Sequence, residues 1–326
     1  MSQKLSLGID LGGTNTSLGI VSSQGQVLQF MSFESCVGQG PQDWIERVSG
    51  QIHQLLLSAK TPPKSIHGIG IGVAGLVDQS KGSLLYSPNF PRWDHTSIAT
   101  LLSQRMKIPV SVDNDVNAMA LGEMLFGSAR GLKNVICMTL GTGVGGGIIL
   151  DGKIYRGEQF SAGEVGHMTL FPYGPRCSCG NRGCIEVYAS SRGILRKAKE
   201  QLRRDTHSLL SKKLQQEELT VKLISDCAKQ NCSVSKMILG KTAEYLGIFI
   251  AGLVNAWNPS AIVIGGRIAQ AGDNLFRPLK LTVKQRAMEV PFRGVRIVPA
   301  GLKFKAGIVG AAMLPMGFAK VFHRFH

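Results

Sequence analysis

The sequence has 326 residues, of which 44% are hydrophobic and 40 are glycine. This length and composition predict a turn-rich protein with a sizeable core in two domains or lobes, and they exclude an intrinsically disordered chain. The formal net charge is +16, but the Lys and Arg residues are dispersed and are not interleaved with aromatic residues. We therefore interpret the charge as a solvated basic surface that favours phosphorylated ligands, not as a nucleic-acid-binding face.

The cysteines and the apolar runs indicate the compartment. Three of the seven cysteines cluster and the other four are scattered, which fits a reducing compartment with a metal site better than a disulfide framework. We expect no secretory signal, because residues 1–6 lead directly into a strand-like run. The longest apolar candidate, residues 247–254, is far too short for a membrane span. These features predict a cytoplasmic protein without a membrane partner.

The first third of the chain alternates strand and helix patterns. Strands are predicted at residues 5–10, 17–21, 27–33, 67–73 and 109–112, and helices at 42–59 and 98–106. After Asp113-Asn114-Asp115, apolar residues with helical spacing predict another helix: Val116, Ala118, Met119, Leu121 and Leu125.

A second strand-turn-strand unit at residues 134–150 echoes the first. In both units a strand ends in a Gly/Thr turn and another apolar strand follows, a weak internal repeat that suggests two related α/β lobes. The remaining elements are helices at 191–202, 220–229, 234–257 and 306–320, a strand at 261–264, and a polar surface connection at 205–218.

The segment from Glu164 to Glu186 concentrates metal-binding side chains. The spacing H-x9-C-x-C-x4-C brings together His167, Cys177, Cys179 and Cys184. Thiolate sulfur and imidazole nitrogen suit a closed tetrahedral zinc site. The alternative is a chance cluster of buried thiols. Prolines and glycines make this segment an irregular loop, where thiols would be exposed unless a metal held them, so the sequence favours zinc.

Two glycine turns are candidate phosphate cradles. Gly12-Gly13-Thr14 and the run from Gly141 to Gly147 each follow a strand, and glycine lets backbone N–H groups approach phosphate oxygens. Taken alone, each turn is more typical of a tight hairpin, and neither is followed by the Walker lysine. Together with Gly265-Gly266 they favour a bipartite nucleotide site, at which Asp10 would hold Mg²⁺ through water.

Two further polar segments have ordinary interpretations when taken alone. Asp113-Asn114-Asp115 lies where a strand passes into a helix, a ligand position in open α/β sheets, but it is also a plain N-cap cluster. Ser87-Pro88-Asn89 has an amide that could bind a polyol, but it is also an ordinary turn.

Taken together, these motifs resemble the ROK family of sugar kinases and sugar-responsive repressors over nearly the whole length. The matching segments are G-I-D-L-G-G-T-N, G-V-A-G-L-V-D, S-P-N-F-P-R-W, D-N-D-V-N, T-L-G-T-G-V-G-G-G, E-V-G-H, C-S-C-G-N-R-G-C-I-E and N-P-S-A-I-V-I-G-G. The zinc segment is specific to the family, whereas the glycine turns also occur in the wider actin/hexokinase/Hsp70 group. E-V-Y-A-S after the last cysteine looks most like the glucokinase branch.

The resemblance implies an ATP-dependent hexose kinase, with glucose as the first expectation, that acts in carbohydrate metabolism such as glycolysis. It implies that Asp115 is the general base, and that zinc is structural and held by His167, Cys177, Cys179 and Cys184. The implied sugar-binding residues are Asn89, Asn114, Asp115, Glu164, His167 and Glu186. The implied residues for ATP and Mg²⁺ are Gly8, Asp10, Gly12, Gly13, Thr14, Asn15, Gly141, Thr142, Gly143, Gly145, Gly146, Gly265 and Gly266.

The implied fold is the two-lobed ribonuclease-H-like α/β fold of the actin/hexokinase type, with a zinc-stapled loop at residues 164–186. We expect a small lobe at residues 1–115, to which the C-terminal helix of residues 303–326 returns, and a large lobe at residues 116–302. A homodimer is expected by resemblance. Three positions depart from the family pattern: Asn15 stands where many relatives carry Lys, Arg267 where a third Gly is frequent, and Asp113 where Glu is frequent.

Several alternatives stay open. Within the family these are kinases of N-acetylglucosamine, N-acetylmannosamine, fructose or allose, and a kinase that uses polyphosphate as the donor. From other classes they are a sugar-sensing repressor and a catalytically idle zinc scaffold. Family repressors carry an N-terminal helix-turn-helix module, whereas here the phosphate turn begins at Gly12. We therefore expect no DNA partner, and the presence of Asp10 and Asp115 disfavours an idle scaffold.

Overall fold

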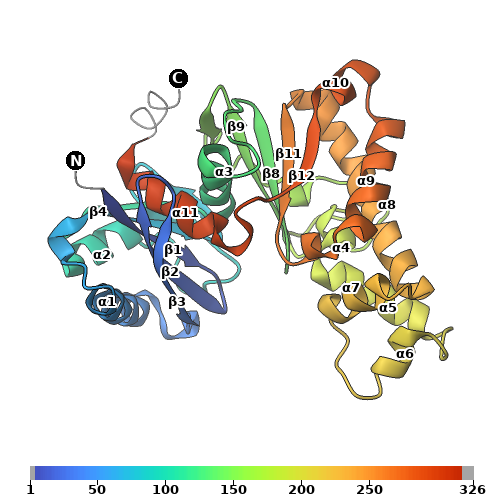
Figure 1. Cartoon of the computed structure of the whole chain (residues 1–326), viewed down its shortest axis with the longest axis horizontal. Coiled ribbons are helices and arrows are strands. Elements are labelled where there is room, and N and C mark those ends of the chain that lie inside the picture. Colours follow the sequence, from blue (N-terminus) through green and yellow to red (C-terminus); the bar gives the residue numbers. More distant parts are fainter. Residues whose placement is uncertain (1–3, 318–326) are drawn as a thin grey trace. The chain divides into compact units, whose positions relative to one another are not determined.

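The computed structural model describes residues 4–317, and its strands form two five-stranded sheets (Figure 1). The first sheet has the order β3-β2-β1-β4-β7 and the second the order β10-β9-β8-β11-β12. In each sheet, three consecutive strands are followed by two later ones in the same pattern. The weak sequence repeat therefore corresponds to a repeated strand order.

The strands of the first sheet lie within one or two residues of their predicted bounds. They are β1 (Leu5–Leu11), β2 (Asn15–Ser22), β3 (Val27–Glu34), β4 (Ile66–Val73) and β7 (Val110–Asn114). Strands β1, β2 and β3 pair antiparallel, whereas β4 pairs parallel with β1 and with β7. The carboxyl ends of β1, β4 and β7 consequently meet at one edge of the sheet, the edge where ligands bind in such folds.

The second sheet contains β8 (Val135–Leu140), β9 (Val144–Leu150), β10 (Lys153–Tyr155), β11 (Ala261–Gly265) and β12 (Arg296–Pro299). Strands β10 and β12 were not predicted. The chain forms two compact units, each built from more than one stretch of sequence. Unit 1 comprises Met1–Cys137, Gly147–Gly163 and Ala300–His326, and unit 2 comprises Met138–Gly146 and Glu164–Pro299. The division passes through β8 and β9.

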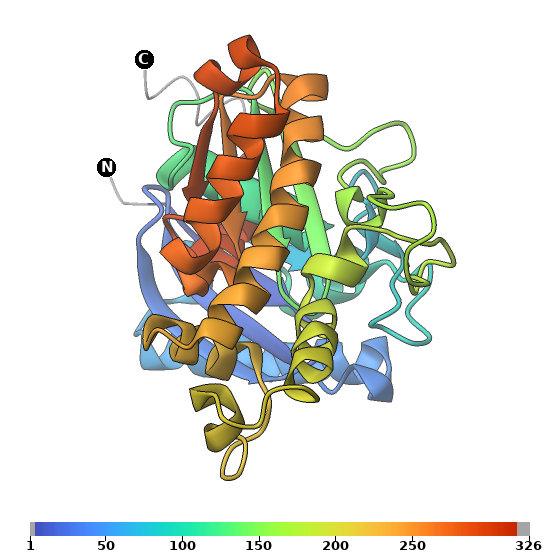
Figure 2. The ribbon, with the colours of Figure 1, turned by 90° about the vertical axis from the view of Figure 1, so that its right-hand side faces the viewer.

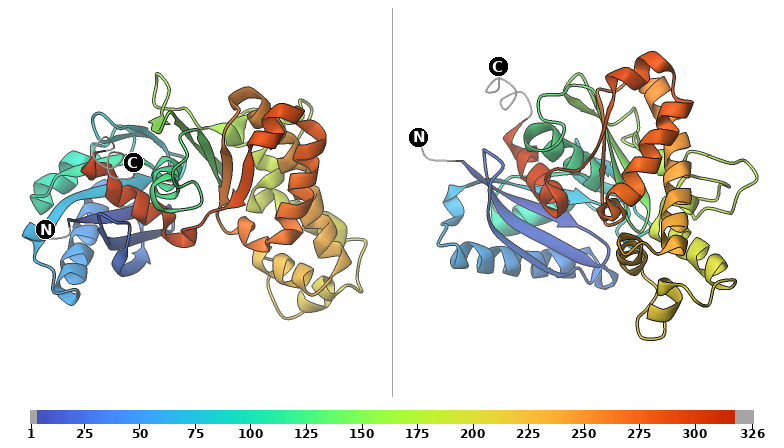
Figure 3. Two further views of the ribbon diagram at one scale, coloured as in Figure 1. Left: turned by 45° about the horizontal axis from the view of Figure 1, so that its top comes forward. Right: turned by 45° about the vertical axis from the view of Figure 1, so that its right-hand side comes forward.

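Alternating glycine and isoleucine decide what packs on each face of the first sheet. A Cβ at Gly8 would lie 2.0 Å from the carbonyl oxygen of Ile308, and one at Gly70 would lie 1.7 Å from that of Ala311. These glycines let the backbone of α11 (Ala306–Met313) rest directly on the strands (Figure 3). Their neighbours Ile9 and Ile71 face the hydrophobic core of unit 1 and are fully buried.

The opposite face is covered by α1 (Pro41–Ser58) and α2 (Ile98–Met106), both close to their predicted bounds. Trp44 of α1 is buried, and its indole nitrogen donates to Thr16 Oγ1 of β2 (3.2 Å). The short hairpin of β5 (Leu76–Asp78) and β6 (Ser83–Tyr86) was not predicted.

Helix α11 ends earlier than the predicted residue 320. The α-helical turns stop at Met313, and a 3-10 turn at Leu314–Met316 follows. Pro315 has no N–H to continue the helix, and Gly317 adopts a φ of +71°. The predicted residues 318–320, and the rest of the C-terminal segment to residue 326, lie outside the described residues.

Unit 2 consists mainly of helices. They are α4 (Glu186–Ala189), α5 (Ser191–Leu202), α6 (Leu209–Lys213), α7 (Val221–Lys229), α8 (Ser233–Trp257), α9 (Asp273–Arg286) and α10 (Glu289–Gly294). Helices α8 and α9 run side by side (Figure 2). Gly247 allows this packing, because a Cβ there would lie 2.5 Å from the Thr282 side chain. The predicted surface connection at 205–218 was wrong in part, because it contains α6, whose Leu210 is fully buried.

Among the residues described, α8 is the one helix long and apolar enough to cross a membrane by length and composition, with a mean hydropathy of 1.5 over 18 residues. The expectation that no segment reaches this length was therefore wrong, since it counted an uninterrupted apolar run and not the whole helix. Within the protein, 61% of that window is buried. The apolar surface of α8 thus belongs to the core of unit 2.

Glu123 of α3 (Asp115–Phe126) is fully buried and holds two connecting segments of unit 1. Its carboxylate accepts hydrogen bonds from the backbone N–H groups of Ser128 (2.8 Å), Gly301 (2.9 Å) and Leu302 (2.8 Å). Glu123→Ala would remove the charged acceptor of three backbone hydrogen bonds, so we expect the free energy of unfolding to fall by about 3 kcal/mol or more. Urea unfolding measures this, with the exposed Glu46→Ala of α1 as the control within about 0.5 kcal/mol. A similar loss in both variants would contradict the assignment.

Candidate active site

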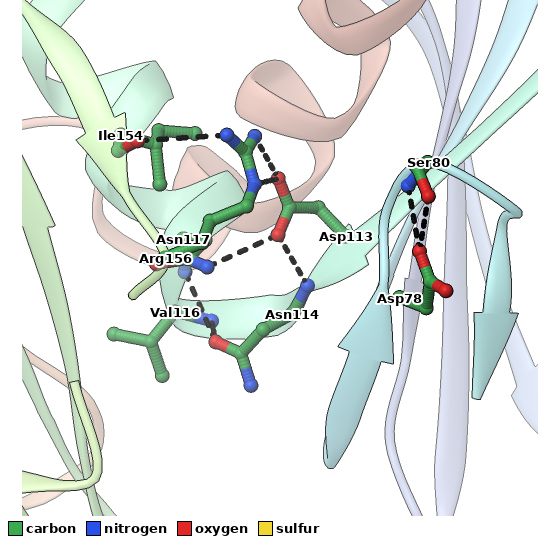
Figure 4. Close-up of polar contacts among 8 residues, drawn as sticks. All are labelled: Asp78, Ser80, Asp113, Asn114, Val116, Asn117, Ile154 and Arg156. Atoms are coloured by element: carbon green, nitrogen blue, oxygen red, sulfur yellow. Dashed lines mark hydrogen bonds and ion pairs between the residues drawn. The ribbon is translucent and has the colours of Figure 1, made fainter. Parts of the chain in front are cut away.

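Asp115 is the first residue of α3, directly after β7. Asn114 caps this helix, because its Oδ1 accepts from the N–H groups of Val116 (2.8 Å) and Asn117 (3.1 Å) (Figure 4). Its Nδ2 donates to the Gly75 carbonyl (3.1 Å). The N-cap interpretation of this segment is therefore confirmed for Asn114. The cap holds the backbone on both sides of Asp115, so the position of this residue at the start of the helix is set by the fold.

Asp10 lies at the carboxyl end of β1, half-buried beside Asp115. It points toward the first turn of α11, because a Cβ at Gly307 would lie 2.8 Å from Asp10 Oδ2. Burial, and secondarily the charge of Asp115, raises the pKa of Asp10 to about 7. A carboxylate whose pKa is raised beside another carboxylate favours a cation, and Mg²⁺ prefers such oxygen ligands.

The Gly12-to-Asn15 turn joins β1 to β2 and is closed by a hydrogen bond from Gly12 N to Asn15 O (3.1 Å). Gly13, Thr14 and Asn15 are exposed. A Cβ at Gly13 would lie 3.4 Å from the Cβ of Asn89, so the structure brings the predicted phosphate turn next to the predicted sugar-binding amide. Gly8, in contrast, lies inside β1 against α11, where it has a packing role.

In unit 2 the Gly141-to-Gly143 turn follows β8 and is closed by Gly141 N donating to Gly143 O (3.0 Å). Glu186 lies directly against it: Glu186 Oε2 accepts from Val144 N (3.0 Å), and a Cβ at Gly143 would lie 2.5 Å from that oxygen. A side chain at position 143 would therefore displace this carboxylate. Thr142 at the tip of the turn is exposed.

Gly265 and Gly266 follow β11 in the same unit. Gly265 is buried, whereas Gly266 is exposed and adopts a φ of +88°. A Cβ at Gly266 would lie 2.3 Å from the carbonyl oxygen of Leu140, at the end of β8. The strand-end glycines therefore pass close to the start of the Gly141 turn.

The predicted zinc ligands converge. One ligand atom from each of His167, Cys177, Cys179 and Cys184 lies within 4.8 Å of the others. Cys177 Sγ is 3.6 Å from His167 Nδ1, and Cys179 Sγ is 3.8 Å from Cys184 Sγ. A tetrahedral ion with metal–sulfur bonds of about 2.3 Å spaces two sulfurs about 3.8 Å apart and a sulfur and a nitrogen about 3.6 Å apart. The donor set and its spacing fit zinc.

The loop that carries the predicted zinc ligands also packs against the rest of unit 2. A Cβ at Gly166 would lie 1.9 Å from the Val144 carbonyl oxygen, so the segment before His167 touches the start of β9. Further along the loop, the ring of Phe171 packs edge-on against Tyr188 (5.4 Å) and Tyr245 (5.6 Å). An irregular loop is thereby held in one arrangement.

The two ring nitrogens of His167 face different partners. Nδ1 faces Cys177, whereas Nε2 lies 3.9 Å from Glu164 Oε2. Both side chains remain partly open to solvent, His167 at 34% and Glu164 at 49% exposure. Burial raises the pKa of Glu164, an effect that the charge of His167 opposes and that of Glu186 supports. A histidine with one nitrogen on the metal side has the other free to bind a ligand.

Sequence reasoning missed two polar contacts that shape these sites. Glu186 accepts from Val144 N over 42 residues, and Arg156 pairs with Asp113 over 43 residues. The only sequence signal for the first was the carboxylate that ends the cysteine segment, and nothing pointed to the second.

A sequence model of the ROK family matches residues 6–317. The glucokinase of Thermotoga maritima is 36% identical over 310 residues, which cover 94% of the chain and 96% of that protein. The xylose repressor of Caldicellulosiruptor bescii is 32% identical over 304 residues, which cover 93% of the chain and 76% of the repressor.

One solved structure, a ROK family glucokinase from Streptomyces griseus in complex with glucose and AMPPNP, has a TM-score of 0.84 to the chain. It is 32% identical and covers 96% of the chain and 100% of its own. The predicted two-lobed α/β fold of the hexokinase type is thereby confirmed.

Proposed function

The chain belongs to the ROK family, and we propose that it transfers the γ-phosphoryl group of ATP to the 6-hydroxyl of glucose. The observation that carries this proposal is the pair of carboxylates at the carboxyl edge of the first sheet. Asp115 lies at the capped start of α3 with Asp10 beside it. A sugar kinase needs one carboxylate for the hydroxyl proton and one for the metal, and this pair of neighbouring carboxylates supports that assignment.

Asp115 is the proposed general base. As the sugar oxygen attacks the γ-phosphorus, the bond from phosphorus to the β–γ bridging oxygen breaks, ADP leaves, and the hydroxyl proton passes to Asp115. A base positioned in this way contributes about 10²–10⁴-fold in rate. The rest of the acceleration comes from alignment of the reactants and from neutralisation of phosphate charge by Mg²⁺, which Asp10 would hold through water.

The glycine turns are the proposed nucleotide-binding elements. Their exposed backbone N–H groups at Gly13 and Thr142 suit phosphate oxygens, and Gly265-Gly266 would lie near the adenosine. Asn15 in the first turn offers an amide where many relatives offer a lysine, so phosphate binding here rests more on the backbone.

The proposed sugar-binding groups are hydrogen-bonding side chains: Asn89, Asn114, Asp115, Glu164, His167 and Glu186. For His167, Nδ1 would bind zinc and Nε2 a sugar hydroxyl, in keeping with the opposite directions in which its two nitrogens point. Zinc has four protein ligands in this scheme and no open position. Its proposed role is to order the loop that carries Glu164 and Glu186.

Replacing Cys179 with serine tests this role. We expect Cys179→Ser to bind less zinc and to raise the KM for glucose, because the loop loses a thiolate ligand. Cys232→Ser, at a buried thiol just before α8 and outside the cluster, is the control with unchanged zinc. Zinc content is measured by elemental analysis and KM by steady-state kinetics. A variant without zinc but with the wild-type KM would show that the metal does not order the sugar site.

The experiment that tests the function is a coupled ADP-release assay with MgATP and a panel of hexoses. The panel contains glucose, mannose, fructose, allose, N-acetylglucosamine and N-acetylmannosamine. Preference for glucose supports the proposal, and preference for an amino sugar keeps the mechanism with another substrate. The similarity to a xylose repressor favours one second candidate, a sugar-responsive regulator. Sugar binding without turnover by zinc-loaded protein would support that candidate.

A further inference from the structure

Asp113, two residues before Asp115, is a buried carboxylate whose two oxygens are both engaged (Figure 4). Oδ1 accepts from the backbone N–H of Asn114 (2.8 Å) and from Asn117 Nδ2 (3.0 Å). Oδ2 accepts from Arg156 Nε (3.0 Å) and Nη2 (2.5 Å). Its side chain is 2% exposed, so the charge has been removed from water and depends on these partners.

Arg156 reaches Asp113 from the segment that follows β10. Its planar guanidinium directs two N–H donors, Nε and Nη2, at the single oxygen Oδ2, an arrangement of fixed donors that lysine does not have. A third nitrogen, Nη1, donates to the Ile154 carbonyl (3.5 Å), which fixes the fork from behind. Within unit 1 the side chain of Asp113 is buried and that of Arg156 is 22% exposed, so loss of Arg156 leaves an uncompensated buried charge on Asp113.

The hydrogen bonds converge on the backbone that carries Asp115. Asp113 holds Asn114 through its N–H, and Asn114 caps α3 at Val116 and Asn117. Behind the turn, a Cβ at Gly72 would lie 3.2 Å from the Cα of Asp115, so β4 closes off the other side. Asp115 thus lies on a segment that is hydrogen-bonded before and after it and is packed against β4 behind it.

We propose that Asp113 and Arg156 form a positioning pair that aims the Asp115 carboxylate at the hydroxyl it deprotonates. This inference rests on the proposed function, because the pair acts through Asp115, the proposed general base. It deepens that function by adding two residues that touch neither sugar nor nucleotide. A base misplaced by about 1 Å can cost about 10²-fold in rate, so loss of the pair acts on kcat more than on sugar binding.

The test is a double-mutant cycle with Arg156→Met, Asp113→Asn and the double variant. We expect each single variant to lower kcat for hexose about 10-fold or more, while the sugar KM changes less than about 3-fold. The double variant is expected to be no worse than the poorer single one, because the two residues act as a unit. Arg156→Lys, which keeps the charge and loses the fork, is expected to restore kcat only in part.

Asp78→Asn is the matched control, since Asp78 is a buried carboxylate of the same unit with hydrogen-bond donors of its own. Its Oδ1 accepts from Ser80 (Figure 4) and from the backbone N–H of Lys81. It is expected to lower stability and to leave kcat unchanged. Equal losses of kcat in this control and in Arg156→Met, or unchanged kcat in Arg156→Met, would overturn the proposal.

A second readout separates this proposal from the proposed function. Hydrogen exchange of peptides that span residues 113–118 is expected to be faster in Arg156→Met than in wild type and Asp78→Asn, whether or not the wild type turns over a sugar. An inactive wild type would refute the proposed function. Unchanged exchange in Arg156→Met would refute the positioning pair.

Discussion

Asp115→Asn is expected to lower kcat for glucose at least about 10²-fold while glucose binding stays measurable. The asparagine is nearly the same size as the aspartate and keeps an oxygen for the hydrogen bond that Asp115 Oδ1 accepts from Val116 N (3.0 Å). The start of α3 should therefore stay folded. What disappears is the carboxylate that we propose as the acceptor of the hydroxyl proton, so we expect the loss to fall on the chemical step.

Asp43→Asn provides the charge-matched control, since Asp43 is an exposed carboxylate on α1 of the same unit. The measurement is steady-state turnover with MgATP, together with calorimetric titration of glucose into each variant. Near-wild-type turnover of Asp115→Asn would remove this residue from the base role. Loss of glucose binding together with turnover would instead limit Asp115 to a role in sugar binding.

The strands of the first sheet could be predicted closely because their information is local. Alternating glycine and isoleucine in β4 and the Gly/Thr turn after β1 are visible within a few residues. The zinc cluster could be predicted for the same reason, since all four ligands fall within one short segment that closes on itself. The spacing of residues within one short segment was enough to predict both the strands and the metal ligands.

What the sequence did not indicate depends on contacts between distant segments. Arg156 looks like any surface arginine until β10 places it beside Asp113. Helix α9 was missed because Pro278 lies inside it and its residues are mostly polar, and it is instead supported by packing against α8. The role of Gly8 was assigned from the motif around it, whereas its close contact with Ile308 comes from a helix 300 residues later.

Asp10→Asn is expected to stabilise the Mg²⁺-free protein at neutral pH and to abolish most of its activity. In the folded protein the pKa of Asp10 is raised from its ordinary value of 3.8 to about 7, first by burial and then by the charge of Asp115. Between these values the folded state keeps a proton that the unfolded chain has released. The stability that this carboxyl group contributes is complete below about pH 3.8 and is lost as the pH rises toward 7.

Asparagine cannot ionise, so the stability of the variant does not fall in this way as the pH rises. The unfolding free energy of Asp10→Asn relative to wild type should grow by up to about 1.4 kcal/mol per pH unit between pH 5 and pH 7 and then level off. Urea unfolding in Mg²⁺-free buffer at pH 5, 7 and 8 measures it. Asp78→Asn serves as the contrast: hydrogen bonds from Ser80 lower the pKa of Asp78, so its loss should destabilise the protein equally at all three pH values.

The activity of Asp10→Asn completes the argument. If Asp10 holds Mg²⁺ against the phosphates, the variant should lose about 10²-fold or more in kcat/KM for MgATP, comparable to the loss of one electrostatic group in other active sites. Mg²⁺ should then stabilise the wild type at pH 8 and leave the variant unchanged, because the ion offsets the buried negative charge. An Asp10→Asn protein with wild-type activity, or one that Mg²⁺ stabilises as much as wild type, would mean that the metal is bound elsewhere. The destabilising position of Asp10 would then have no catalytic explanation. If Asp10→Asn instead gains stability and loses activity, the carboxylate lowers the stability of the protein because metal binding needs it.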